Sequence, residues 1–131
     1  MQMPSFALRI NLLVTDLGFI AYWCISYLGV LPKEWLFKDY QNPILISWNW
    51  SFAPLDLLAS AMGLSSLMAA KKGLISWKPL ALISLSLTFC AGFMALNFWT
   101  LQKDFDPWWW LPNFYLMVWP IFLGKQLFES Y

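Results

Sequence analysis

The chain has 131 residues, of which 60% are hydrophobic, 20% aromatic and only 11% charged, whereas soluble proteins average about 25% charged residues. This composition excludes an ordinary soluble domain, and the net charge of +1 without a long basic run gives no basis for nucleic-acid binding. The chain has no histidine, and Cys24 and Cys90 lie far apart, so we predict no metal site, redox pair or cofactor. Both cysteines are predicted to be small buried apolar side chains.

Four apolar segments follow one another along the chain, at about residues 7–31, 43–70, 79–101 and 107–128. Each is long enough to cross a hydrocarbon core of about 30 Å at a helical rise of about 1.5 Å per residue. Asn42 before Pro43 and Asp106 before Pro107 are expected to cap two of the helices, because proline is well tolerated at the first helical position. The sequence therefore predicts a single all-α integral membrane domain, a bundle of four transmembrane helices.

The orientation is predicted from the basic residues near the helix ends. Four passes would separate five of these residues from the other three: Arg9, Lys71, Lys72, Lys78 and Lys125 on one side, and Lys33, Lys38 and Lys103 on the other. Because cytoplasmic loops carry the excess of lysine and arginine, we expect both termini to be cytoplasmic.

The first segment contains Asp16, and the second contains Asp56, about 12 Å and 21 Å from the inner boundary by the helical rise. A central aspartate costs about 2.5–3.5 kcal/mol on an insertion scale, so each is a candidate functional residue. Arg9 lies near enough to snorkel towards Asp16, which is the structural alternative for that residue. Without a deep cation, burial should favour the neutral form of at least one carboxyl. The expected partners are neutral side chains: Asn11, Thr15, Tyr22, Ser60, Ser84, Ser86, Thr88 and Tyr115.

Polar residues of the second segment share one helical face, because Asn49, Asp56 and Ser60 are spaced by seven and then four residues. Pro54 lies beside this stripe and has no N–H group to donate to the carbonyl of Trp50. Three asparagines from three segments, Asn49, Asn97 and Asn113, are expected at one level near the outer boundary. They predict either hydrogen bonds between helices or part of a ligand site.

Aromatic residues accompany both aspartates: Tyr22 and Trp23 follow Asp16, and Trp48 and Trp50 precede Asp56. Aromatic faces combined with a carboxylate suit a lipophilic cation, through cation–π attraction and opposite charge. Packing and membrane anchoring are the structural alternative. The run of tryptophans at residues 108–110 favours an aromatic belt at headgroup depth, with a lid over a site as the other reading.

Several stretches resemble the small YvaD-like membrane proteins of Firmicutes: TDLGFIAYW at residues 15–23, LFKDYQNPIL at 36–45, WNWSFAPLDL at 48–57, and WKPLA through LTFCAGF in the third segment. The resemblance covers most of the chain. It implies a four-helix protein of the bacterial plasma membrane and brings no established activity. The small multidrug resistance transporters are similar in layout only, because they have glutamate where Asp16 stands and lack a counterpart of Asp56.

The leading hypothesis is an intramembrane pocket that binds or transports a lipophilic or cationic small molecule with protonation of a carboxylate. Its predicted residues are Asp16, Asp56, Asn49, Tyr22, Trp23, Trp48, Trp50, Asn97 and Asn113. One alternative is a membrane enzyme that uses Asp56 and Asp16 for acid catalysis on a lipid-soluble substrate, as an isomerase or terpenoid cyclase would. Another is a structural accessory subunit. Besides the lipid bilayer and the small molecule, a second copy of the chain is an expected partner, because one such unit is small for a permeation path.

Overall fold

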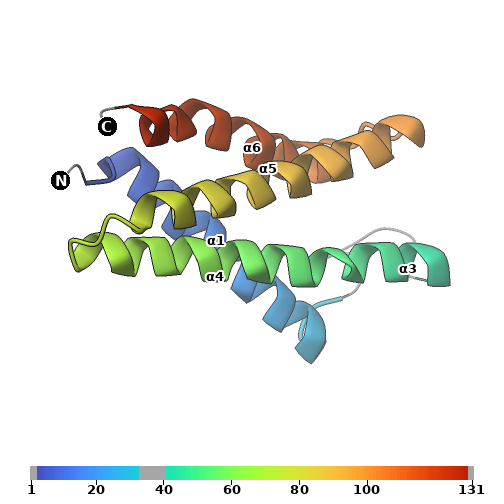
Figure 1. The fold of residues 1–131 in the computed structure, drawn as a ribbon. Helices are drawn as coiled ribbons and strands as arrows, with labels where there is room; N and C mark the ends of the chain where they lie inside the picture. The colour runs from blue at the N-terminus through green and yellow to red at the C-terminus, as the bar shows by residue number, and fades with distance from the viewer. Residues whose placement is uncertain (1–2, 33–40, 130–131) are drawn as a thin grey trace.

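The computed structural model describes residues 3–32 and 41–129, and these residues form helices and connections without a strand (Figure 1). The elements in chain order are α1 (Phe6–Leu28), α3 (Pro43–Trp50), α4 (Phe52–Lys71), α5 (Trp77–Leu101), α6 (Pro107–Gly124) and the 3-10 helix η1 (Lys125–Phe128). The all-helical prediction is confirmed for this part of the chain. Lys33 and Lys38, which entered the orientation argument, lie outside the described residues.

Local capping determines where the helices begin and end. The predicted caps are confirmed: the Asn42 side chain accepts from the Ile44 N–H, and the Asp106 side chain accepts from the Trp108 N–H, each at 3.0 Å. Helix α1 ends at Leu28, before the predicted limit at residue 31. The reason is Gly29, which adopts a left-handed conformation with φ of 67° and donates its N–H to the Ile25 carbonyl.

The second apolar segment is interrupted at Ser51, between α3 and α4. The Ser51 hydroxyl donates to the Trp48 carbonyl at 2.5 Å, and three residues later Pro54 has no N–H for the Trp50 carbonyl. The break therefore arises where proline disturbs the regular hydrogen-bond ladder. It lies between Asn49 and Asp56, the two polar residues that the sequence placed on one face.

Neighbouring helices pack side by side and run in alternating directions (Figure 1). Both described chain ends lie at the same end of the bundle as the α4–α5 connection (Figure 1). The two ends are also bonded, because the Ser5 N–H donates to Gln126 Oε1 and Gln126 Nε2 donates to Ser5 Oγ, each at 2.9 Å. Helix α6 returns along α5, since Gly92 of α5 lies against the α6 backbone and Gly124 of α6 lies against Leu85.

The buried interior has two parts. An apolar cluster of α1, α4, α5, α6 and η1 residues includes Leu8, Leu12, Trp77 and Trp119. Small polar side chains from α1, α4 and α5 are buried further along the bundle: Thr15, Asp16, Ser60, Ser66, Ser84 and Thr88. Burying a polar group costs free energy of desolvation. The cluster of buried polar side chains therefore marks this part of the interior as a candidate functional region.

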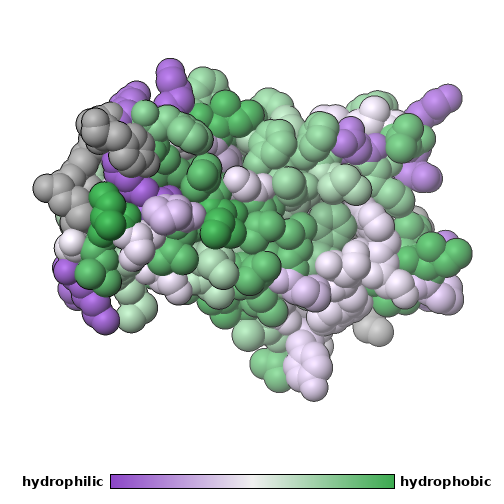
Figure 2. Space-filling model, viewed as in Figure 1, coloured by the Kyte–Doolittle hydropathy of each residue, from purple (hydrophilic) through white to green (hydrophobic). Residues whose placement is uncertain are grey.

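The outer surface is largely apolar, with hydrophilic residues gathered towards the two ends (Figure 2). Three helical stretches are long and apolar enough to cross a membrane, namely Phe6–Leu28, Pro43–Lys71 and Trp77–Leu101. Cys24 and Cys90 are exposed on this surface, so the prediction that they are buried is wrong. The physical reason is that lipid tails are as apolar as a protein core, so an apolar residue on a membrane helix need not face inwards.

Candidate ligand pocket

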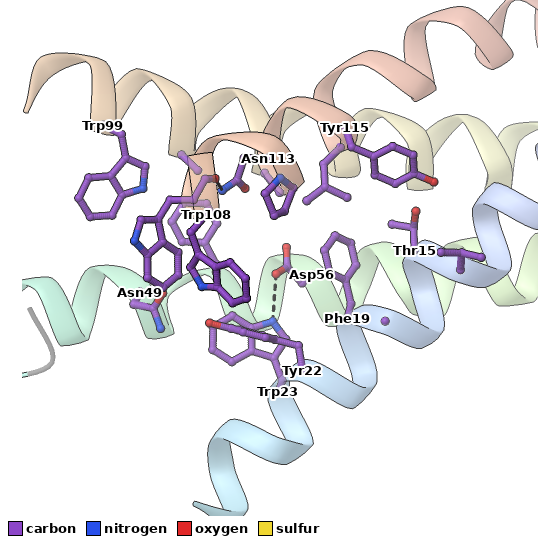
Figure 3. A pocket seen from close by; sticks show the side chains of 18 of the residues that line it. Thr15, Phe19, Tyr22, Trp23, Asn49, Asp56, Trp99, Trp108, Asn113 and Tyr115 are labelled. Carbon is purple, nitrogen blue, oxygen red and sulfur yellow. Dashed lines mark hydrogen bonds between the residues drawn. The ribbon is translucent and has the colours of Figure 1, made fainter. Parts of the chain in front are cut away.

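A cavity of about 710 Å³ opens between the helices, and nine of its twenty described lining residues are aromatic (Figure 3). Helices α1, α3, α4, α5 and α6 all contribute to the lining: Val14, Thr15, Gly18, Phe19, Tyr22, Trp23, Leu31, Trp48, Asn49, Phe52, Asp56, Ala91, Ala95, Trp99, Trp108, Trp109, Pro112, Asn113, Tyr115 and Leu116. Cavities of this size hold drug-sized ligands, typically with apolar walls and a few polar groups.

Asp56 is the only charged side chain among these lining residues, and it is 7% exposed. Its Oδ2 atom accepts a hydrogen bond of 2.9 Å from the indole Nε1 of Trp23 (Figure 3). Its Oδ1 atom is buried and has no hydrogen-bond partner. One of the two carboxyl oxygens of Asp56 is therefore hydrogen-bonded and the other is not. The donor is an indole N–H from α1, a group that was absent from the predicted set of polar partners.

Aromatic neighbours hold the Trp23 ring in place. Its centroid lies 5.1 Å from that of Trp50 and 4.8 Å from that of Tyr22, which meets it edge-on. Trp50 does not line the pocket and instead supports Trp23 from behind. The α1 residues Tyr22 and Trp23 thus form one wall of the pocket together with Asp56.

A second aromatic group comes from α3 and α5. Trp48 stacks on Phe98 with centroids 4.0 Å apart and meets Trp99 edge-on at 5.8 Å. Helix α6 adds Trp108 and Trp109, which the sequence favoured as belt residues and which line the pocket here. Trp110 turns away, because its Nε1 donates to the Asp104 carbonyl at 2.8 Å. The sequence does carry a signal for Trp108 and Trp109. Asp106 and Pro107 fix where α6 begins, and this start determines the direction in which each tryptophan points from the helix.

The three predicted asparagines do not form one hydrogen-bonded layer. Asn49 and Asn113 line the pocket, whereas Asn97 is exposed and lies outside it. Asn113 Nδ2 donates within its own helix to the Trp109 carbonyl at 2.8 Å, and Asn49 Nδ2 is buried without a partner. Asn97 is separated because it follows Ala95 by two residues, about 200° around α5 from the inward face.

Asp16 does not belong to the lining of the pocket, although the sequence grouped it with Asp56. Its side chain is 0% exposed, and both carboxyl oxygens are buried without a hydrogen-bond partner. Arg9 is exposed and makes no ion pair with it, so the structural alternative for Asp16 is not formed. The carboxyl groups of Asp16 and Asp56 therefore lie in different environments within the interior of the bundle.

The charged groups of the pocket limit which ligands it can bind. No lysine or arginine occurs among the described lining residues, and no group of three or more possible metal ligands occurs within the described ranges. A carboxylate surrounded by aromatic rings attracts a cation or accommodates a neutral apolar molecule. An anionic ligand would meet only negative charge there.

The structure thus defines an all-helical protein with three helices able to cross a membrane and an aromatic pocket around one carboxyl group. Residues 8–131 match the family described as "Family of unknown function (DUF5360)", and the chain belongs to that family. A Bacillus subtilis (strain 168) protein described as "Uncharacterized protein YvaD" is 49% identical over 123 residues, which cover 94% of this chain and 92% of that protein. These findings confirm the predicted YvaD-like resemblance. No solved structure matches.

Proposed function

We propose that the pocket binds a lipophilic cation and that the protein transports it across the bacterial plasma membrane in exchange for a proton. The observation that carries this proposal is Asp56, a buried carboxyl with one unpartnered oxygen inside an aromatic cavity. A bound cation would supply the positive charge that the described lining residues do not provide.

The walls of the pocket favour a ligand that is both charged and apolar. Cation–π attraction to tryptophan and tyrosine is strongest where water is excluded, and contributes about 0.5–2 kcal/mol per contact. Tyr22, Trp23 and Trp108 offer such rings around Asp56 (Figure 3), and Trp48 lines the same pocket. A small hydrated ion would leave this large apolar surface unused, so an organic cation fits better.

Four membrane crossings support a transport role, and α6 supplies the fourth in this proposal. The helix has 18 residues, which reach about 27 Å, and it packs along α5 in the opposite direction. Pro112, Pro120, Asn113 and the tryptophan run lower its mean hydropathy below that of the three stretches named above. If α5 crosses the bilayer, its antiparallel neighbour crosses it too. Both termini then lie on one side, and the basic residues assign that side to the cytoplasm.

The helical hydrogen bond that Pro54 cannot donate to Trp50 is missing next to the pocket, although Ser51 itself keeps a helical conformation with φ of −66° and ψ of −18°. Irregular backbone is tolerated inside a membrane where it is packed in protein or lines a cavity, and transporters often bind their cargo at such breaks. Trp48, Asn49 and Phe52 flank the break and line the pocket. A small change at Ser51 would move the α3 side of the pocket relative to Asp56.

Coupling to protons follows from competition for one carboxyl group. A proton on Asp56 neutralises the charge that attracts the cation, and a bound cation favours loss of that proton. The two ligands are therefore mutually exclusive at Asp56, which is the requirement for exchange. We expect cation affinity to fall as the pH is lowered.

Binding of tetraphenylphosphonium to the purified protein in weakly buffered detergent should release protons. Asp56→Asn should abolish this release and lower the affinity at least about tenfold, which corresponds to about 1.4 kcal/mol. Proton release is read with a pH dye and affinity by calorimetry. Asp106→Asn is the matched control, because it makes the same chemical change at a helix cap where asparagine also functions.

Equal proton release from Asp56→Asn and the parent protein would refute the exchange mechanism. An acid catalyst or an accessory subunit predicts no release from either protein, so the same measurement also separates the transport proposal from those two alternatives.

Cysteine labelling of intact cells should report the proposed orientation. With Cys24 and Cys90 replaced by alanine, Lys103→Cys between α5 and α6 should react with a membrane-impermeant maleimide. Lys72→Cys, which follows α4, should react only after the cells are permeabilised, because it lies on the cytoplasmic side. The opposite labelling pattern would place the termini outside, and labelling of both positions from outside would contradict the four crossings.

A further inference from the structure

A second carboxyl group lies in the polar part of the interior, apart from the pocket. Asp16 of α1 faces α4 and α5, where the nearest side chains are small or carry hydroxyl groups. The point at which a Cβ atom on Gly63 would lie is 1.9 Å from Asp16 Oδ2 and 2.8 Å from Ser84 Oγ. The carboxyl therefore packs against the α4 backbone in space that only glycine leaves free, with the Ser84 hydroxyl beside it.

The surrounding hydroxyls present lone pairs to this carboxyl group. Ser84 Oγ donates its hydrogen to the Ala59 carbonyl at 2.8 Å, and Ser60 Oγ donates to the Asp16 main-chain carbonyl at 2.9 Å. Neither hydrogen is available to the Asp16 side chain. An ionised Asp16 would therefore receive no hydrogen bond from either serine, and neither of its carboxyl oxygens has another donor in the described part of the chain.

No counter-charge compensates an ionised Asp16 among the described residues. The titratable side chains of α1 and of the three helices packed in the same bundle are Arg9, Tyr22, Cys24, Tyr27, Asp56, Lys71, Lys78, Cys90 and Tyr115. Asp56 accepts a hydrogen bond from Trp23, and the Tyr115 hydroxyl donates to Asn11. Lys71 and Lys78 belong to the last turn of α4 and the first turn of α5, at the end of the bundle. A buried charge without a partner costs several kcal/mol, so the neutral acid is the stable form here.

We propose that Asp16 is a proton-binding site, separate from the ligand pocket and occupied in this arrangement of the helices. A proton fits the geometry, because Oδ2 lies directly against α4 and neither carboxyl oxygen receives a hydrogen bond from any described group. The site deepens the proposed exchange function and, in its role as a proton store, rests on it. The proton stored at Asp16 is distinct from the one that a cation displaces from Asp56.

Two buried hydroxyls without hydrogen-bond partners are the candidates for passing this proton towards the pocket. Thr15 precedes Asp16, lines the pocket, and has a buried hydroxyl oxygen without a hydrogen-bond partner (Figure 3). Thr88 on α5 is likewise fully buried and unpartnered. Neither threonine is hydrogen-bonded to Asp16 or Asp56 in this arrangement, so a transfer requires these side chains to move closer together. The O–H bond of Asp16 would then break as its proton binds a threonine oxygen, and that hydroxyl would release its own hydrogen towards the Asp56 carboxylate. The negative charge then moves from Asp56 to Asp16, and no other reactant is needed.

Infrared spectroscopy of the full-length protein with isotope-labelled aspartate, without any cation ligand, tests the occupancy directly. In an Asp56→Asn background, which removes the proton of the pocket carboxyl, the protein should show at neutral pH a protonated-carboxyl band that is lost when Asp16→Asn is added. In Asp16→Glu the labelled band should be replaced by an unlabelled glutamic acid band, which keeps the test decisive if Asp16→Asn does not fold. Exchanging sodium chloride for choline chloride should leave the band unchanged.

Persistence of the band in both Asp16 variants would overturn the assignment, and its loss on addition of sodium would make the site a metal-ion site instead. Transfer to D₂O tests the route, because the band should shift several-fold more slowly in the Thr15→Val, Thr88→Val double variant than in the parent. An unchanged rate would refute this path. The proposed cation exchange fails separately, through absent proton release with tetraphenylphosphonium, and that failure would leave the Asp16 band in place.

Discussion

Gly63→Ala is expected to lower the free energy of unfolding by about 2–5 kcal/mol, and it should be among the most damaging single substitutions in the chain. The added methyl group would lie 1.9 Å from Asp16 Oδ2, a contact that cannot be accommodated without moving the carboxyl. Overpacking costs about 1–3 kcal/mol, and pushing a buried carboxyl into the surrounding apolar packing adds a cost of similar size. Unfolding by denaturing detergent, followed by circular dichroism, measures the change.

Gly18→Ala is the matched control, because a Cβ atom at Gly18 would meet nothing within 4 Å. This variant should be as stable as the parent or more stable by up to about 1 kcal/mol, since alanine is the better helix former. Similar losses of stability in the two variants would mean that helix propensity, rather than the contact with Asp16, explains the effect at Gly63.

Trp23→Phe is expected to weaken tetraphenylphosphonium binding by about 10- to 100-fold while preserving the fold. It removes the indole N–H that donates to Asp56 Oδ2 and keeps an aromatic ring in the wall. Hydrogen bonds to charged groups contribute about 1.5–3 kcal/mol, and each 1.4 kcal/mol is tenfold in affinity. The cation needs the ionised carboxylate, which this donor stabilises. Calorimetric titration at constant pH gives the comparison.

Trp119→Phe provides the control for loss of an indole N–H. Trp119 is also buried, yet its Nε1 has no hydrogen-bond partner, so replacing it should change cation affinity little. Unchanged affinity in Trp23→Phe, or an equal loss in Trp119→Phe, would contradict a specific role for the bond between Trp23 and Asp56.

The elements of the fold were largely predictable because their signals are local. Asn42 with Pro43 and Asp106 with Pro107 mark helix starts within two residues, and long apolar runs mark the helices themselves. The early end of α1 depends on the left-handed conformation of Gly29, which competes with the apolar residues that follow it. The position of Cys24 depends on which helical face meets lipid, and hydropathy does not distinguish that face from the interior.

The site was predictable in its residue types and less so in its pairings. Asp56, Tyr22, Trp23, Trp48 and Asn49 do line or border one pocket, because the polar stripe and the aromatic clusters face inwards. The bond from Trp23 to Asp56 joins residues 33 positions apart and depends on how α1 rotates against α4. The spacing of residues within one helix does not predict how α1 is rotated against α4.

The separation of Asp16 from Asp56 follows from contacts between helices. Both residues are on inward faces, so the sequence placed them in one group. The structure separates them because the Asp16 carboxyl turns towards Gly63 and Ser84, while Asp56 turns towards Trp23. Asn97 is different, because its 200° offset from Ala95 around α5 is visible in the sequence once the inward face is known.

The contribution of α6 to the pocket has a consequence for biosynthesis. Chains emerge from the ribosome N-terminus first, at roughly 5–20 residues per second, so Asp56 is synthesised well before Trp108 and Trp109. During that interval the nascent protein contains Asp56 but lacks the α6 side chains that complete the pocket. The candidate pocket is therefore among the last features to form, and a ribosome that stopped before α6 would leave an incomplete bundle with Asp56 unshielded.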